Sequence, residues 1–247
     1  MKQIKFMMAA LALMMGISFT SCLDSGNTGD VWDLGGYMTV QQYMGTVTLK
    51  MDNGVSIYPT NPSDLMLDAL TGKYPERVVA YCKLLEGDEF VETKKDYQAQ
   101  VISWSQVPVK DFCTRPDTIN SEKVIPLQSV YGGWAANGYI NASFVFNYTG
   151  AAFDFELYPE KAEGDKLTLR LKQTAGSQGG GQLVEYVYSF RQPHFGALQD
   201  QLEELGLSPL TPVNDSITVT IVGTGERETD LKGEGANETF RMATANY

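Results

Sequence analysis

The sequence predicts an all-β protein, and three observations lead to this fold class. Apolar and polar residues alternate with period two along most of the chain, which is typical of half-buried strands. Asn53-Gly54 separates two such runs and predicts a hairpin, because both central residues of its tight turn need a positive φ. Helical spacing over several turns occurs in one place, after Pro193. One short helix is therefore expected among many strands.

The first half of the chain contains four predicted strands. They are expected in residues 46–51, 55–58, 77–85 and 96–107. The alternation lapses between Thr60 and Pro75, where prolines interrupt the chain and leave room for one or two helical turns. The segment 108–126 predicts a connection, and we place the boundary between two domains there, 36–115 and 116–247.

The second half contains six predicted strands and the helix. The strands are expected in residues 140–148, 153–157, 167–172, 184–190, 216–222 and 239–242. Phe195, Leu198 and Leu202 recur at helical spacing, and Gly206 predicts the end of the helix. Residues 129–139 are expected to connect strands.

The N-terminal segment has the layout of a bacterial export signal. Lys2 and Lys5 precede an uncharged run over residues 6–19, which is too short to span a bilayer. Ser21 is the small residue required before a cleavage point. Cys22 follows directly, as a lipoprotein signal requires, because the thiol is acylated before the peptide is cut. In the alternative, an ordinary secretory signal is cleaved here and Cys22 is incidental.

The lipoprotein signal predicts a membrane anchor. We expect residues 1–21 to be removed and Cys22 to carry several acyl chains, which together hold a protein on a membrane lastingly. The polar, glycine-containing residues 22–35 are expected to form a flexible tether. Leu23 differs from the aspartate that is associated with inner-membrane retention, so we expect the outer membrane. The sequence leaves the periplasmic and the surface-facing side open.

The charge of the chain argues against nucleic acid as a partner. Removal of Lys2 and Lys5 with the signal changes the formal charge from −11 to −13, because residues 1–21 contain no acid. Such a balance repels phosphate backbones, and no long basic segment overrides it. We therefore expect no nucleic-acid partner.

Two cysteines follow Cys22. Cys82 shares one strand face with Val78, Ala80 and Leu84, which predicts a small buried apolar side chain. Cys113 follows a predicted strand. An exported protein permits a disulfide between Cys82 and Cys113, but spacing alone does not establish the geometry, and the pairing stays open.

Strand and turn motifs resemble those of the NigD-like lipoproteins of Bacteroidota-type bacteria. The matching segments are Gly45-Thr46-Val47, Asp52-Asn53-Gly54 with Ile57-Tyr58-Pro59, Arg77-Val78-Val79-Ala80-Tyr81, the strand from Tyr97 to Trp104, Asn137-Gly138-Tyr139-Ile140-Asn141 with Phe144, and Tyr188-Ser189-Phe190-Arg191. The resemblance implies an OB-like N-terminal barrel followed by a C-terminal antiparallel β-sandwich with one short helix. It also suggests a role linked to bacteriocin immunity or export. The chain departs from the pattern between Thr60 and Pro75, and at Gln192, where a histidine is expected.

Catalysis is not expected, because the chain lacks a concentrated catalytic set. His194 is its single histidine, and no G-x-S-x-G motif presents a serine to it. A helix-start or packing role for His194 is the better interpretation. Carboxylates that could act in pairs cluster in two expected loops. These are Glu86, Asp88 and Glu89 in the first, and Glu160, Glu163 and Asp165 in the second.

We interpret the two carboxylate clusters as solvent-exposed hairpin tips. The neighbouring residues in the sequence do not form an apolar environment that would raise the pKa of the carboxyl groups. The clusters lack the sequence pattern of a calcium-binding loop, but calcium binding by their carboxylates is kept as an alternative. One histidine and two cysteines make zinc improbable, so we expect no metal and no cofactor. The glycines Gly179-Gly180-Gly181 join two strands without a following helix, so they predict a loop and not a phosphate cradle.

Tyr131, Trp134 and Tyr139 gather around glycines and are candidate glycan-binding residues. Aromatic rings stack on sugars, and OB folds bind oligosaccharides. The alternative is that Trp134 packs between the two domains, as its usual burial favours. Thr118 and Ser216 each follow an aspartate, in Asp117-Thr118-Ile119 and Asp215-Ser216-Ile217, and are candidate O-glycosylation sites.

These observations together favour an envelope-anchored, non-enzymatic lipoprotein that binds or scaffolds an envelope protein or a glycan. The alternative is a carbohydrate-binding accessory lipoprotein of a glycan-uptake system, with Trp134 in its site. A hydrolase is the third and weakest hypothesis.

Overall fold

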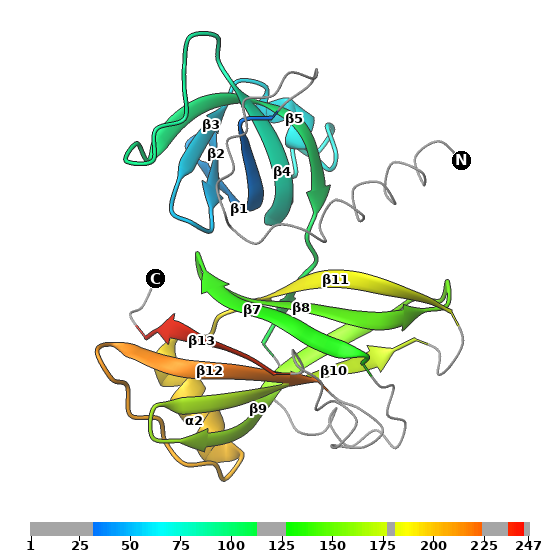
Figure 1. The fold of residues 1–247 in the computed structure, drawn as a ribbon, viewed down its shortest axis with the longest axis vertical. Coiled ribbons are helices and arrows are strands. Elements are labelled where there is room, and N and C mark those ends of the chain that lie inside the picture. Colours follow the sequence, from blue (N-terminus) through cyan, green and yellow to red (C-terminus); the bar gives the residue numbers. More distant parts are fainter. Residues whose placement is uncertain (1–31, 113–126, 177–180, 224–236, 245–247) are drawn as a thin grey trace. The chain divides into compact units, whose positions relative to one another are not determined.

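Five strands in the first half of the chain close into a barrel (Figure 1). The computed structural model describes residues 32–112, 127–176, 181–223 and 237–244. The barrel strands are β1 (Leu34–Tyr43), β2 (Thr46–Met51), β3 (Ser56–Pro59), β4 (Arg77–Leu84) and β5 (Asp96–Gln106). Their order is β1-β2-β3-β5-β4, and β4 pairs with β1 to close the ring. Only β3 and β5 pair in parallel. The OB-like expectation is confirmed.

Alternating residues of these strands fill the barrel. Met38, Leu49, Ile57, Val78 and Ala99 are fully buried. The 3₁₀ helix η2 (Pro62–Leu65) places Leu65, also fully buried, in the same apolar cluster. In the proline-rich segment 60–75, where one or two helical turns were expected, η2 is a single turn.

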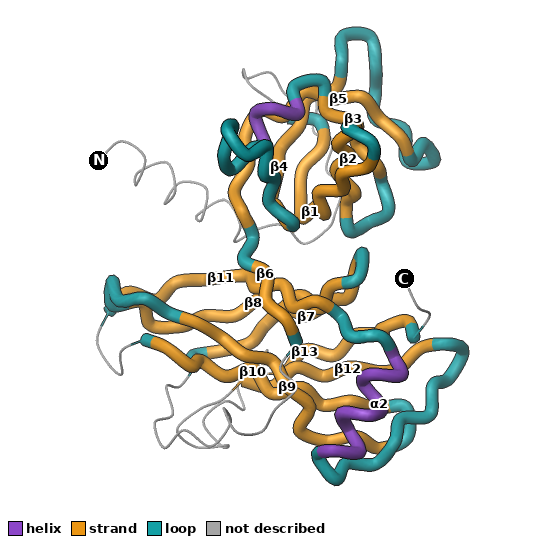
Figure 2. Tube along the Cα trace, turned by 180° about the vertical axis from the view of Figure 1, so that it is seen from behind, coloured by secondary structure: helices purple, strands orange, loops and turns teal. Residues whose placement is uncertain are grey.

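Eight strands, from β6 onward, form two sheets (Figure 2). The strands are β6 (Val109–Asp111), β7 (Ser129–Ala136), β8 (Tyr139–Tyr148), β9 (Asp154–Glu163), β10 (Lys166–Ala175), β11 (Gln182–Arg191), β12 (Ser216–Gly223) and β13 (Asn237–Ala243). One sheet has the order β13-β12-β10-β9 and the other β6-β11-β8-β7. Each contains one parallel pair, β10 with β12 and β6 with β11, among antiparallel neighbours. The helix α2 (Phe195–Glu204) precedes Gly206, whose φ of +68° ends it as predicted.

Aromatic and aliphatic residues from both sheets share one core. Phe144 and Phe146 on β8, Phe155 on β9 and Phe190 on β11 are buried and belong to it. Leu198 and Leu202 bring α2 onto the same cluster. The fold class predicted from the alternation is confirmed.

Three strands were not recognised in the sequence: β1, β7, and β6, which lies in the segment 108–126 that was expected to be a connection. β1 begins at Leu34, so the last two residues assigned to the tether belong to the barrel. Residues 129–136, expected to connect strands, form β7, and only Asn137-Gly138 is a turn, with both residues at positive φ. A Cβ on Gly132 would lie 2.9 Å from the Cβ of Ser143, and one on Gly133 would lie 3.0 Å from the Phe240 ring. These glycines therefore permit close packing and do not mark a loop.

Cys82 lies in the barrel core, fully buried and free of a disulfide. Cys113 lies outside the described residues. Burial raises the pKa of the Cys82 thiol from 9.0 to about 12. Among the described residues, no helix has the length and apolar character needed to cross a bilayer.

The buried thiol predicts slow labelling of Cys82. In the native full-length protein we expect the peptide containing Cys82 to resist iodoacetamide at pH 8 and to react once urea unfolds the chain, because only the exposed thiolate is nucleophilic. Since the folded pKa exceeds the unfolded one, this thiol stabilises the fold fully below pH 9 and loses that effect as pH rises toward 12. Peptide mapping after timed labelling measures the rate. Rapid labelling in native buffer would contradict the burial.

Candidate functional site

Arg77, the first residue of β4, is fully buried and all five of its side-chain N–H groups have acceptors. Nη1 donates to Asp52 Oδ1 at 2.6 Å and to Thr39 Oγ1 at 2.9 Å. Nη2 donates to Asp52 Oδ2 at 2.8 Å and to Asn141 Oδ1 at 2.9 Å. Nε donates to Ser189 Oγ at 3.3 Å. A buried guanidinium with every donor satisfied avoids the large penalty of an unpaired buried charge.

Asp52 lies in the turn between β2 and β3, and its carboxylate accepts four hydrogen bonds. Besides the two from Arg77, Oδ2 accepts one from Trp134 Nε1 at 2.7 Å, and Oδ1 accepts one from Asn137 Nδ2 at 3.1 Å. The turn itself is set by Asn53, whose Oδ1 accepts from the Val55 amide, and by Gly54 at a φ of +88°. The hairpin predicted from Asn53-Gly54 therefore positions the carboxylate.

Asn141 on β8 and Ser189 on β11 complete this network. Both are fully buried, and Ser189 Oγ donates to Asn141 Oδ1 at 2.6 Å. Asn141 Nδ2 donates to the carbonyl of Trp134 at 3.3 Å. The network thereby joins barrel strands to strands of the β6-β11-β8-β7 sheet.

Two of the three candidate glycan-binding aromatics contact this network. Trp134 packs its ring against Tyr37, with centroids 5.0 Å apart, and donates its N–H to Asp52. The Tyr139 ring lies 5.1 Å from the Arg77 guanidinium carbon, and its hydroxyl donates to Glu76. Both rings are half-buried and have intramolecular partners, which is the arrangement expected if Trp134 packs between the barrel and the sheets.

Tyr131 is the third of these aromatics. Its hydroxyl is buried and has no hydrogen-bond partner within bonding distance among the described residues. Burial, and next the nearby Glu185 carboxylate, raises the pKa of the Tyr131 hydroxyl, which holds it in the neutral form.

Exposed ion pairs border the network. Arg191 donates to both carboxylate oxygens of Glu76, at 3.0 and 2.5 Å, and to Asp111 Oδ1 at 2.5 Å. The two carboxylates raise the pKa of Arg191 further above its already high value. Gln192 donates through its side chain to the Ala243 carbonyl. This border is polar and internally paired.

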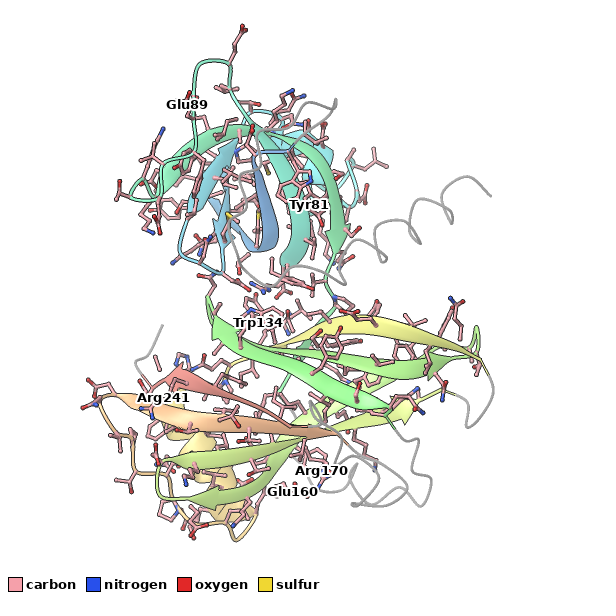
Figure 3. The ribbon with its side chains drawn as sticks, in the orientation of Figure 1. Tyr81, Glu89, Trp134, Glu160, Arg170 and Arg241 are labelled. Carbon is pink, nitrogen blue, oxygen red and sulfur yellow. The ribbon has the colours of Figure 1, made fainter. Side chains whose placement is uncertain are left out.

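The two carboxylate clusters differ in their surroundings (Figure 3). Glu86, Asp88 and Glu89 are exposed in the β4–β5 loop, as expected, and Asp88 pairs with Lys94 at 3.7 Å. Glu160 and Glu163 are on β9 and not in a loop, because β9 extends further than predicted.

The partners of the second cluster are basic side chains. Glu160 pairs with Arg170, and Asp165 accepts from Thr218 and Arg241. Lys161 lowers the pKa of Glu163, the opposite of what a general acid needs. Among the described residues, no group of three or more metal-ligating side chains gathers.

The remaining candidate residues are dispersed. His194 is exposed directly before α2, and its side chain makes no capping hydrogen bond. Ser216 begins β12, and its hydroxyl donates to the Asn214 carbonyl at 3.2 Å. Cys22, Thr118 and the first two glycines of Gly179–Gly181 lie outside the described residues.

The outer surface of the barrel was not predicted as a candidate site from the sequence. The outer sides of β1, β2, β3 and β5 carry exposed, uncharged residues, among them Tyr43 and Tyr58, which are 72% and 41% exposed. The signal that could have revealed it is the lack of charge in segments 34–49, 55–63 and 97–109.

Comparison with known proteins identifies this architecture. A NigD-like immunity protein from Bacteroides caccae aligns with 86% of this chain and 97% of its own, with a TM-score of 0.52 and 15% identity. The chain has a NigD-like fold. No protein-family model matches the sequence, and neither does any curated protein sequence.

Two further solved structures are similar to this chain in fold. A Parabacteroides distasonis protein described provisionally as toxin-related aligns with 85% of this chain and 93% of its own, with a TM-score of 0.56 and 15% identity. A Bacteroides fragilis protein described provisionally as a lipoprotein aligns with 86% and 98%, with a TM-score of 0.51 and 12% identity. At these identities the likeness concerns the fold alone.

Proposed function

We propose that the protein is an envelope lipoprotein, anchored through Cys22, that acts as a non-catalytic binding module. The observation that carries the proposal is the Arg77 network, in which the polar groups bond to one another. Asp52 uses four acceptor positions and Arg77 five donors on internal partners, so neither has a free group for proton transfer or nucleophilic attack. The lipoprotein description of the Bacteroides fragilis neighbour supports the anchor.

A network of this kind suits a binding module. It fixes residues of the barrel and of the sheets in one arrangement, and a surface that is ordered before binding loses less conformational entropy when a partner arrives. A hydrolase is disfavoured, because the exposed carboxylates of the first cluster have no apolar frame and those of the second pair with basic side chains. Turnover that disappears in Glu86→Gln or Glu160→Gln would contradict a non-catalytic role.

Loss of the Cys22 thiol should abolish both acylation and cleavage of the signal. In Cys22→Ala we expect a protein that keeps residues 1–21 and carries no acyl chains, because the thiol is acylated before the peptide is cut. Fractionation of cells followed by intact-mass analysis of the N-terminal peptide measures this. Ser21→Ala serves as a matched control, since alanine is also small and should leave acylation intact. An unmodified N-terminus at residue 22 in the unaltered protein would exclude the anchor.

We propose further that the function of this binding module is linked to bacteriocin immunity or export. It is supported by the fold shared with the Bacteroides caccae protein, which is named an immunity protein. Expression in a bacteriocin-sensitive strain tests it, because an immunity protein lowers killing by the bacteriocin of its own gene cluster. Equal killing with and without the protein would rule this role out.

A further inference from the structure

Two rows of uncharged side chains lie on the outer side of the neighbouring strands β1, β2, β3 and β5. In the first row Gln41 lies opposite Thr48, and Tyr58 lies opposite Gln98. In the second row Tyr43 lies opposite Thr46, and the Thr60 amide donates to the Ala99 carbonyl beside Gln100. The neutral face consists of these eight residues: Gln41, Tyr43, Thr46, Thr48, Tyr58, Thr60, Gln98 and Gln100. All are exposed except the half-buried Thr48.

Charged residues border the neutral face, and Lys83 on β4 lies directly opposite Gln100. The next row contains Lys50, which pairs with Ser56 on β3, and Asp96, which lies opposite Ser56 on β5. Segments 34–49, 55–63 and 97–109 contain no charged residue, although the whole chain has a formal charge of −11. The exposed surface of a soluble protein is usually rich in charge, so an uncharged four-strand face in an acidic chain points to an uncharged ligand.

The side chains of the neutral face match the chemistry of a carbohydrate. Tyrosine rings present large apolar surfaces on which a sugar ring can lie, and glutamine and threonine side chains both donate and accept hydrogen bonds, as sugar hydroxyls do. Four neighbouring strands at about 4.8 Å spacing span about 15 Å. This is long enough to contact consecutive units of a polymer and not only its end.

We propose that the neutral face binds an uncharged polysaccharide, with Tyr43 and Tyr58 as stacking platforms and Gln41, Gln98 and Gln100 as hydrogen-bonding groups. The inference rests on the proposed function as a binding module and names the class of its partner. It places the contact on the barrel and not at Trp134, whose ring packs on Tyr37.

Sedimentation of the protein on vesicles tests the proposal and the anchor separately. Full-length lipidated protein is reconstituted into phosphatidylcholine vesicles and incubated with fluorescein-labelled dextran, galactomannan, xyloglucan or mannan, or with chondroitin sulfate as an anionic probe. We expect the protein to sediment with the vesicles and at least one neutral polysaccharide to sediment with it, while chondroitin sulfate stays in solution. Protein that stays in the supernatant would refute the lipid anchor and leave polysaccharide binding measurable by affinity electrophoresis.

Single-residue variants locate the contact. Tyr58→Ala and Tyr43→Ala should each weaken polysaccharide binding about five- to tenfold, the effect expected for one lost stacking contact. Tyr148→Ala is the matched control, because Tyr148 is 39% exposed on the sandwich and Tyr58 is 41% exposed. Circular dichroism verifies that each variant is folded, and Tyr58→Phe, which keeps the ring, should bind within about twofold of the unaltered protein.

Three outcomes would overturn the inference. The first is that no neutral polysaccharide sediments with protein-loaded vesicles. The second is that Tyr58→Ala and Tyr148→Ala bind equally well. The third is that the Tyr43 hairpin binds lipid instead: its neighbour Met44 is 86% exposed at the turn, so vesicle binding by Cys22→Ala that disappears in Met44→Gln would assign this end of the barrel to the membrane.

Discussion

Replacement of Arg77 by methionine is expected to lower the free energy of unfolding by about 3–5 kcal/mol. Methionine keeps most of the apolar stem but leaves the Asp52 carboxylate, whose side chain is only 10% exposed, without its cation. Asn141 and Ser189 lose their guanidinium partner in the same step. Urea denaturation of the full chain measures the change as a shift in the midpoint at constant slope.

A surface arginine provides the control for this prediction. Arg241 pairs with Asp165 at 3.3 Å, but its side chain is 51% exposed, so Arg241→Met should change stability by at most about 1 kcal/mol. Arg77→Lys keeps the charge with three donors in place of five and should fall between the two. Equal costs for Arg77→Met and Arg241→Met would mean that the buried network contributes no more than a surface ion pair.

The barrel strands could be predicted where their alternation is undisturbed. Val47, Leu49 and Met51 alternate cleanly with outward-facing polar residues, and β2 was predicted with its observed bounds. β1 was missed because its alternation is short. Met38, Thr39, Val40 and Gln41 alternate, but Gly35 and Gly36 precede them and a second polar residue, Gln42, follows, so the apolar-polar pattern that reveals a strand is lost at both ends.

The candidate site could be predicted only in part. Trp134 was considered for packing between the barrel and the sheets, and Asn53-Gly54 predicted the turn that holds Asp52. Arg77 was not recognised, because a single arginine at the start of an apolar strand resembles an ordinary strand end. Its partners come from four separate strands or turns, and Ser189 is 112 residues away in the sequence. Such long-range pairing leaves no local periodic signal.

Truncation of Phe155 is the second prediction with a large expected effect. Its ring is fully buried and lies 4.5 Å from Phe144, 5.1 Å from Phe146 and 5.5 Å from Tyr188, measured between centroids. Phe155→Ala should lower the free energy of unfolding by about 3–5 kcal/mol, through lost burial and the cavity left behind. Phe153→Ala, at a half-buried position in the same cluster, should cost clearly less. Similar costs for both would show that the cluster collapses into the cavity.

The same variant tests whether the Arg77 network transmits stability from the sheets to the barrel. Phe155 belongs to the core of the sheets and Cys82 to the barrel core, so the labelling rate of Cys82 reports opening of the barrel alone. If the two cores unfold together, Phe155→Ala accelerates Cys82 labelling in proportion to the lost stability. In the Arg77→Met background this acceleration should shrink, because the buried hydrogen bonds to Asn141 and Ser189 are gone. An unchanged acceleration would assign the coupling to contacts other than Arg77.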